Sequence, residues 1–204
     1  MIVIGLCGGS GSGKTLVCRT ILSLGIPVFE SDAVYHRLIA SSTDCAREIV
    51  NAFGEQVMDT RSGGIDRRAL SRIVFSDSPD AKERLQCLNR ITHRHVAEEF
   101  YRWRDAQEKS GAACVVLEAP LLFESGLDRL CTVTIAVTAP KAIRLARIME
   151  RDGISQEEAV TRISVQRTDE ELVRSCDYVI ENTGTMTEVR DRISHLIKNI
   201  LNRG

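Results

Sequence analysis

The sequence is poor in aromatic residues and has no excess of positive charge. Aromatic residues make up 4% of the 204 residues, and the formal net charge at pH 7 is −1. Proteins that bind nucleic acid carry a basic surface, and those that hold single strands stack bases on aromatic side chains. These shortages disfavour a nucleic-acid-binding ATPase, and we expect no nucleic-acid partner.

Long apolar runs and paired cysteines are missing as well. No apolar run approaches the roughly 20 residues that a membrane-spanning helix needs, so we expect no association with a membrane. The 7 cysteines are scattered without a C-x-x-C pair, and no secretory signal is visible. We therefore expect reduced thiols in a cytoplasmic protein, and no feature calls for an obligatory protein partner.

Glycine, by contrast, is concentrated in one stretch near the start, GLCGGSGSGKT, which follows an apolar run. Its segment Gly8–Thr15 fits the phosphate-binding pattern G-x-x-x-x-G-K-[ST], and a helical pattern comes after it. In such a loop backbone N–H groups face the phosphates, and the lysine reaches the β- and γ-phosphates. A flexible glycine turn that carries a lysine by chance is the alternative. The residues expected to bind ATP here are Gly9, Gly11, Ser12, Gly13, Lys14 and Thr15, with the Thr15 hydroxyl also a ligand of Mg²⁺.

Short continuous apolar runs between helical patterns indicate a buried parallel sheet. The sequence therefore predicts an α/β protein with a five-stranded parallel sheet. The predicted strands are Ile2–Cys7, Ile26–Phe29, Cys114–Leu117, Val133–Val137 and Tyr178–Ile180.

Helix boundaries are marked in the second half of the chain. Pro140 opens a helix that runs to about Arg151, and Gly153 closes it. Two capping boxes of the form S/T-x-x-E open the next helix at residues 155–158 and the last helix at residues 185–188.

The spacing of the strands predicts how a single domain is organised. About eighty residues separate the second and third predicted strands, whereas a plain crossover needs only about a dozen. We expect an inserted helical subdomain for the substrate over the carboxyl edge of the sheet, where open α/β folds bind ligands. The predicted parts are a P-loop kinase core (1–32, 112–139 and 175–204), the helical insert (33–111) and a helical lid (140–174).

Among P-loop proteins, these features favour a small-molecule kinase. A GTPase would carry an N-K-x-D box, which is absent, and residues 115–118 match the Walker B pattern of larger ATPases only in part. An insert that holds the acceptor and an arginine-rich lid suit phosphoryl transfer. Another nucleoside or nucleotide kinase, and a nucleotide-dependent switch that is not a kinase, remain the alternatives.

The chain resembles the dephospho-coenzyme A kinase family over nearly its whole length. The resemblance implies transfer of the γ-phosphate of ATP to the ribose 3′-hydroxyl of dephospho-coenzyme A, the last step of coenzyme A synthesis. It rests on the P-loop, on Glu30-Ser-Asp32, on Ile65–Leu70 followed by Ile73–Phe75, on Leu88-Asn89 and His93, on Pro120–Glu124, on Arg147 to Gly153, on Arg162 and Gln166, and on Asp177 to Gly184.

Asp32 is the candidate catalytic base. It follows the second predicted strand, and the resemblance implies that its carboxylate takes the proton of the attacking hydroxyl. The alternative is a helix N-cap, because Ser31 and Asp32 both precede a helical run. Glu30 stands where the family often has aspartate, so its role near a metal is left open.

Arg144, Arg147 and Arg151 lie on one face of the predicted lid helix. A solvated charged face is the ordinary interpretation of this pattern. Arginines of a lid that closes on the transferring phosphoryl group would also lie on one face of the helix. We select Arg147 as the catalytic residue that contacts ATP, and we expect Arg151 to pair with Asp152 or Glu150.

The resemblance also implies residues that bind the acceptor and the adenine. Arg67 matches a family arginine near the acceptor, with a plain surface arginine as the alternative. His93 either hydrogen-bonds the substrate or orients a neighbour. Pro120, Leu121 and Leu122 shape the acceptor pocket unless the leucines belong to the core, and Asn182 follows the fifth strand where the family places adenine.

Three positions leave questions open. Glu118, at the end of a strand, either holds a Mg²⁺-bound water or has no such role. Cys7 stands where the family often has threonine. Leu172 stands where the family usually has a cation, and Arg167 and Arg174 are its candidate replacements.

Overall fold

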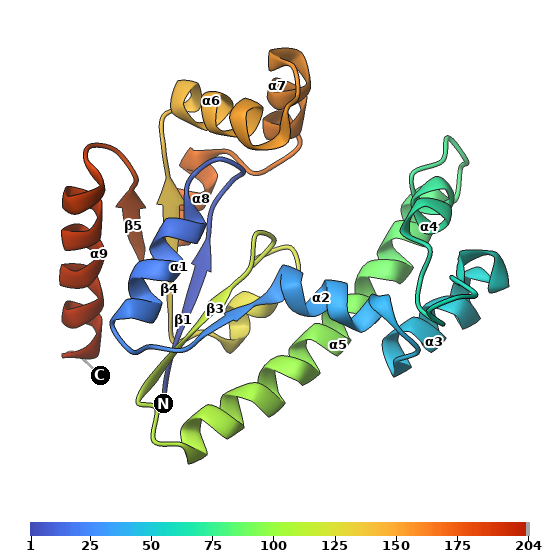
Figure 1. The fold of residues 1–204 in the computed structure, drawn as a ribbon, viewed down its shortest axis with the longest axis horizontal. Helices are drawn as coiled ribbons and strands as arrows, with labels where there is room; N and C mark the ends of the chain where they lie inside the picture. Colours follow the sequence, from blue (N-terminus) through green and yellow to red (C-terminus); the bar gives the residue numbers. More distant parts are fainter. Residues whose placement is uncertain (203–204) are drawn as a thin grey trace. The chain divides into compact units, whose positions relative to one another are not determined.

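The computed structural model describes residues 1–202 and contains two compact units. We call residues 1–29 together with those from 104 onward the core unit, and residues 30–103 the helical unit. The strands are β1 Ile2–Cys7, β2 Val28–Glu30, β3 Cys114–Glu118, β4 Val133–Thr138 and β5 Tyr178–Glu181. The helices are α1 Lys14–Ser23, α2 Ser31–Ala40, α3 Asp44–Phe53, α4 Arg67–Val74, α5 Ala81–Lys109, α6 Lys141–Asp152, α7 Gln156–Ser164, α8 Asp169–Ser175 and α9 Met186–Leu201, with short 3-10 turns η1 Glu55–Val57 and η2 Leu127–Leu130 (Figure 1).

The sheet has the strand order β2-β3-β1-β4-β5, and β1 pairs in parallel with both β3 and β4. The prediction of a five-stranded α/β sheet is confirmed. The second strand begins at Val28 rather than Ile26, because the N–H of Ile26 still bonds to the carbonyl of Ile21 at the end of α1. Because the strands are parallel, their carboxyl ends share one edge, and β1 ends there at the loop leading into α1 (Figure 1).

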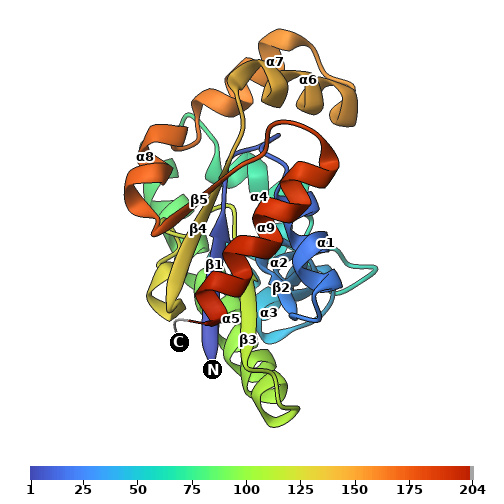
Figure 2. The ribbon, with the colours of Figure 1, turned by 90° about the vertical axis from the view of Figure 1, so that its left-hand side faces the viewer.

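Helices α1 and α9 pack together over one face of this sheet (Figure 2). Ile21 of α1 and Ile193 of α9 are fully buried among strand residues such as Ile4 and Ile135. Burying such a side chain contributes about 1.5–3 kcal/mol to stability, so this packing holds α1 against the sheet.

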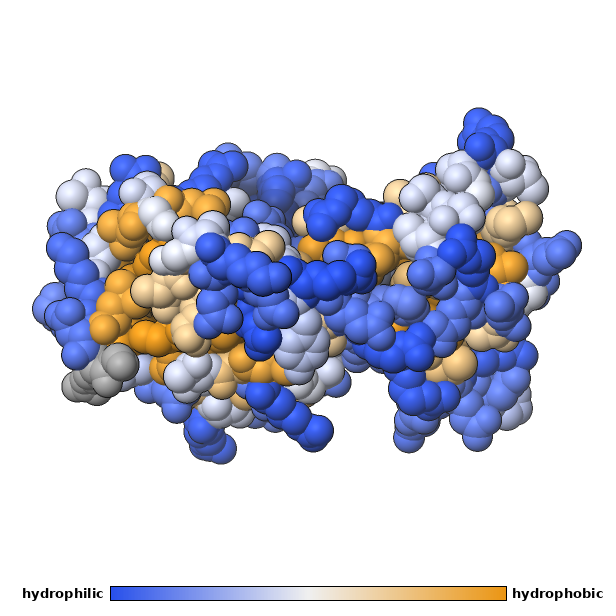
Figure 3. Space-filling view, turned by 90° about the horizontal axis from the view of Figure 1, so that it is seen from below, coloured by the Kyte–Doolittle hydropathy of each residue, from blue (hydrophilic) through white to orange (hydrophobic). Residues whose placement is uncertain are grey.

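Figure 3 views the molecule from the side of the amino ends of the strands. Hydrophobic residues reach the surface of the core unit there, and hydrophilic residues border them. The P-loop follows β1 at the opposite, carboxyl edge, which is where open parallel sheets hold their ligands.

The predicted helix signals in the second half of the chain are confirmed. Pro140 is the N-cap of α6, and Gly153 ends this helix with a left-handed φ of 64°. Both predicted capping boxes are formed, by Ser155 with Glu158 at α7 and by Thr185 with Glu188 at α9. Within residues 1–202, no helix combines the length and the apolar character that crossing a membrane demands.

The helical unit has a hydrophobic core of its own, which includes Ile49, Phe53 and Leu70. Two of its helices begin at side-chain caps. Thr43 accepts from the N–H of Ala46 at α3, and Asp66 accepts from two N–H groups at α4. These caps satisfy donors that would otherwise lack partners, so the cap of α4 fixes where that helix begins.

Candidate active site

The P-loop occupies the connection between β1 and α1, and its shape needs glycine. Gly11 and Gly13 have φ values of 76° and 95°, which side chains rarely adopt. A Cβ on Gly13 would lie 1.8 Å from Nδ2 of Asn182, and a Cβ on Gly11 would lie 2.5 Å from the carbonyl oxygen of Arg144. The loop is therefore pressed against α6 and against the segment after β5.

Lys14 is the first residue of α1 and bends back over the loop. Its Nζ donates to the carbonyl oxygen of Gly8 at 2.8 Å and lies 4.0 Å from Oε1 of Glu118. Glu118 ends β3, which neighbours β1 in the sheet. The ammonium group is thus held at the loop by the Gly8 carbonyl, near the buried carboxylate of Glu118 and at a helix N-terminus that favours anions.

Ser12 and Asn182 stabilise the inside of the loop. The Asn182 side chain is 3% exposed and donates from Nδ2 to the carbonyl oxygen of Ser12 at 2.7 Å. The Ser12 hydroxyl is buried and has no hydrogen-bond partner within the described part of the chain. Asn182 therefore acts on the loop itself, while an orphan hydroxyl remains inside the loop.

A cavity of about 610 Å³ opens beside the loop and brings together four residues predicted to hold ATP or Mg²⁺, namely Gly13, Thr15, Arg147 and Asn182. Sequence reasoning missed two further cations in its lining, Arg19 and Arg190. Arg19 lies one turn after Thr15 in α1, so helical spacing could have found it. Arg190 comes from α9 and reaches the cavity only through the fold. The other lining residues are Leu16, Thr20, Ser23 and Met186.

The three arginines of α6 have different surroundings. Nη1 of Arg147 donates to the carbonyl oxygens of Gly11 at 3.2 Å and Ser12 at 3.4 Å. Arg151 is exposed and binds Asp152 through two hydrogen bonds of 2.8 Å. Of its two predicted partners, Asp152 and Glu150, it is Asp152 that it binds. Arg144 is 4% exposed and binds Asp169, so the interpretation as a solvated face is wrong for this residue.

Cys7, at the end of β1, contacts Cys176 with a sulfur–sulfur distance of 3.5 Å. The hydrogen bond with Cys176, together with burial, raises the pKa of the Cys7 thiol far above its usual range. Cys7 is therefore a buried, neutral thiol at the end of β1.

Asp32 belongs to the helical unit and is the second residue of α2. Its side chain is exposed, and the N-cap of α2 is Glu30, with no side chain bonded to the helix end. The alternative that Asp32 is an N-cap is therefore wrong. Its carboxylate lies in the first helical turn, where the helix dipole favours negative charge.

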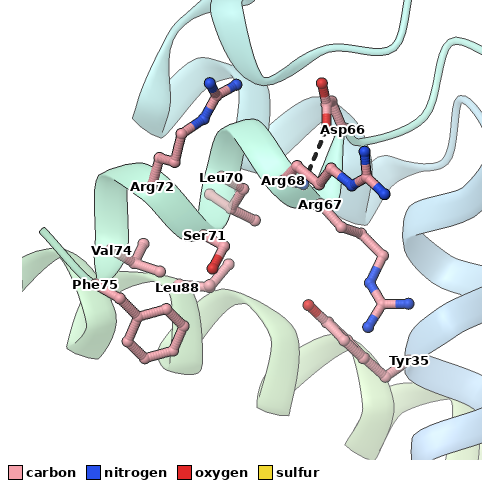
Figure 4. A pocket seen from close by; sticks show the side chains of 10 residues that line it. All are labelled: Tyr35, Asp66, Arg67, Arg68, Leu70, Ser71, Arg72, Val74, Phe75 and Leu88. Atoms are coloured by element: carbon pink, nitrogen blue, oxygen red, sulfur yellow. Dashed lines mark hydrogen bonds between the residues drawn. The ribbon is translucent and has the colours of Figure 1, made fainter.

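The helical unit also contains a cavity of about 990 Å³ (Figure 4). Arg67 begins α4, and its guanidinium group points toward the ring of Tyr35 in this view. Burial raises the pKa of the Tyr35 hydroxyl, which keeps that group neutral, and the positive charge of Arg67 partly opposes the shift. The remaining lining is Asp66, Arg68, Leu70, Ser71, Arg72, Val74, Phe75 and Leu88. A cation beside apolar side chains suits a ligand with an anionic group and a less polar arm.

The two histidines of α5 differ. Burial lowers the pKa of His93, so its imidazole is neutral at pH 7 and suited to hydrogen bonding. Nε2 of His95 lies 2.9 Å from a carboxylate oxygen of Glu48, and His95 is buried. Across residues 1–202 no three side chains of His, Cys, Asp or Glu gather into a metal site.

The two leucines in the turn after β3 differ in burial. Leu122 is fully buried, and a Cβ on Gly5 would lie 3.0 Å from its Cδ2, so Leu122 is a core residue. Leu121 is 54% exposed, and Pro120 is half-buried. Contact with an acceptor is therefore available to Pro120 and Leu121 but not to Leu122.

Arg167 and Arg174, the two candidate replacements for the cation missing at Leu172, lie in different surroundings. Nε of Arg167 binds a carboxylate oxygen of Glu124 at 2.8 Å, and its guanidinium lies 5.1 Å from the ring centre of Phe123. Arg174 is exposed on α8 and lines another cavity, with Thr138 and Glu181. Leu172 itself is buried. Neither arginine has a hydrogen bond to the P-loop among the contacts of the described residues.

Comparison with known proteins shows which family this sequence and fold resemble. The family model described as Dephospho-CoA kinase matches residues 2–188. A Dephospho-CoA kinase of Geobacillus kaustophilus is 38% identical over 197 residues, covering 97% of this chain and 96% of the relative. A crystal structure from Thermus thermophilus has a TM-score of 0.79 at 34% identity over 97% of each chain. The solved Dephospho-CoA kinase from Campylobacter jejuni shares the fold, with a TM-score of 0.61 at 24% identity over 97% of this chain and 96% of its own. With a family model that spans almost the whole sequence, the chain belongs to the dephospho-CoA kinase family.

Proposed function

We propose that the chain transfers the γ-phosphoryl group of ATP to the 3′-hydroxyl of the ribose of dephospho-coenzyme A, giving coenzyme A and ADP. The observation that supports this best is the P-loop, in which Lys14 and Thr15 begin α1 directly after a loop shaped by glycines. Family membership along the chain then favours dephospho-coenzyme A as the acceptor.

The loop fits the phosphates of ATP. The Ser12 hydroxyl is buried without a partner, and the Lys14 ammonium is held at the loop by the Gly8 carbonyl. We assign Gly9, Gly11, Ser12 and Gly13 to phosphate binding through their backbone. Thr15 is exposed at the cavity beside the loop and would hold Mg²⁺, which would neutralise part of the phosphate charge.

Three further residues have roles in the transfer. Asp32 accepts the proton of the 3′-hydroxyl, a general-base contribution of typically about 10²–10⁴ in rate. Arg147 stabilises the negative charge that develops on the transferring group. Arg67 pairs with the diphosphate of the acceptor, because its planar guanidinium can bind two oxygens at once.

The function is tested by ADP release with a panel of acceptors. We expect adenosine and AMP at saturation to turn over at least about tenfold more slowly than dephospho-coenzyme A. Binding energy from the remote diphosphate and pantetheine arm orients the reacting hydroxyl, so truncation lowers kcat as well as binding. Phosphorus NMR of the product should place the new phosphate at the 3′ position. Equal kcat for AMP, or a 5′-phosphorylated product, would identify a nucleoside or nucleotide kinase instead.

Replacing Arg147 with lysine should lower kcat at least about tenfold, with little change in the affinity for ATP. Lysine keeps the charge but lacks the planar fork. Arg151→Lys is the matched control, because Arg151 lies one turn further along α6 and is exposed beside Asp152. That variant should stay within about twofold of wild type in steady-state kinetics. Full activity of Arg147→Lys would show that Arg147 only braces the loop carbonyls.

A further inference from the structure

Arg144 is a buried cation that none of the roles above uses. It lies in α6 and is 4% exposed. Its Nε donates to the carbonyl oxygen of Ser10 at 2.9 Å, and its Nη1 donates to a carboxylate oxygen of Asp169 at 2.7 Å. Its Nη2 is buried and has no hydrogen-bond partner among residues 1–202.

The P-loop rests directly on this guanidinium group. A Cβ on Gly9 would lie 2.2 Å from Nη2 of Arg144 and 2.8 Å from its Cζ. Any larger residue at position 9 would therefore displace the arginine. The open donor faces the backbone of the loop, with no side chain between them.

Gln166 holds the same loop residue from a second direction. Its Oε1 accepts from the N–H of Ser10 at 2.8 Å, and its Nε2 donates to the Ser10 hydroxyl at 3.0 Å. Together with the bond from Arg144, all three polar groups of Ser10 are engaged by the segments around α6 and α7. The tip of the P-loop is thus fixed by α6 and by the turn before α8.

Burying the Arg144 guanidinium with one donor unpaired lowers the stability of the fold unless a bound anion interacts with its charge. Asp169, the charged partner of Arg144, is itself partly exposed, and one guanidinium donor stays unpaired. Burial of a charge with incomplete hydrogen bonding disfavours folding. Behind a loop that holds phosphates, the buried charge of Arg144 attracts those phosphates at short range. Little water screens the attraction there, so it is strong.

We propose that Arg144 is a positioning residue of the phosphate site, which fixes the P-loop at Ser10 and places a positive charge behind Gly9. It supplies the charge that the resemblance leads one to expect at Leu172, a buried apolar residue of α8. The proposal rests on the proposed binding of ATP at the P-loop.

The test measures ADP and ATP affinity by titration calorimetry for wild type, Arg144→Gln and Arg144→Lys. Arg144→Gln should raise the Kd of both nucleotides at least about tenfold and raise KM for ATP, with KM for dephospho-coenzyme A within about twofold. Arg144→Lys should recover part of the lost affinity, because it keeps the charge but cannot bind Ser10 and Asp169 together. Arg102→Gln, an exposed arginine of α5 that pairs with Glu99, is the control and should bind ADP like wild type.

A second pair of variants separates this role from a purely structural one. Arg144→Gln leaves the Asp169 carboxylate without its cation, so it should also lower the thermal midpoint. The double variant Arg144→Gln with Asp169→Asn should recover stability but not ADP affinity. Recovery of both would overturn the proposal, as would unchanged ADP affinity in Arg144→Gln. A wild-type protein that binds no ADP would instead overturn the proposed function.

Discussion

Replacing Lys14 with methionine should lower kcat by about 10³-fold or more while the protein stays folded. Lys14 holds its ammonium group at the loop that binds the phosphates. Charged residues at the transferring phosphoryl group contribute about 10³–10⁵ in rate. Methionine keeps the aliphatic stem, so packing along α1 changes little. Steady-state kinetics with dephospho-coenzyme A, together with a thermal unfolding midpoint, measure the two effects separately.

The structure explains why the fold should tolerate this change. Lys14 donates a hydrogen bond to Gly8 and lies 4.0 Å from Glu118, whereas the core beneath it is formed by residues such as Val17 and Ile21. Lys198→Met, an exposed lysine of α9, is the matched control and should retain full turnover. Turnover near the wild-type level in Lys14→Met would contradict the assignment of the P-loop as the phosphate site.

The parts of this site that are local in sequence were predictable. The P-loop pattern, the strand before it and the helix after it lie within a short stretch, and each follows from a local rule of backbone conformation or capping. The same holds for α6, where Pro140 and Gly153 mark the two ends. A further capping box, Thr168 with Glu171 at α8, has the same S/T-x-x-E pattern and is predictable by the same rule.

The parts that depend on distant segments were not predictable. On a helix rich in arginine, the pattern cannot tell which residue is buried, because Arg144 finds Asp169 and Ser10 far away in the sequence. Leu121 and Leu122 are neighbours of one residue type, and only packing against β1 decides that Leu122 is in the core. The resemblance indicates Asn182 near the adenine, but local sequence cannot show that its side chain also donates a hydrogen bond to the P-loop carbonyl of Ser12.

Replacing Asp32 with asparagine should lower kcat at least about 10²-fold, with KM for both substrates changed by no more than about threefold. The substitution keeps the shape of the side chain and removes the proton acceptor, so the loss lies in the transition state. Asp32→Glu restores a carboxylate at a displaced position, so its kcat should fall between those of wild type and Asp32→Asn. Rates corrected for the folded fraction measure this order.

Stability distinguishes the catalytic role of Asp32 from a structural one. Asp32 is exposed and does not cap α2, so its contribution to folding is limited to the helix dipole, about 0.3–1 kcal/mol. Asp32→Asn should therefore shift the thermal midpoint by only a few degrees. Asp77→Asn, another exposed aspartate of the helical unit, is the control for the loss of one negative charge and should keep its kcat. If Asp32→Asn instead unfolds at a much lower temperature while each folded molecule turns over at the wild-type rate, the carboxylate serves the helix end and the base must be sought elsewhere.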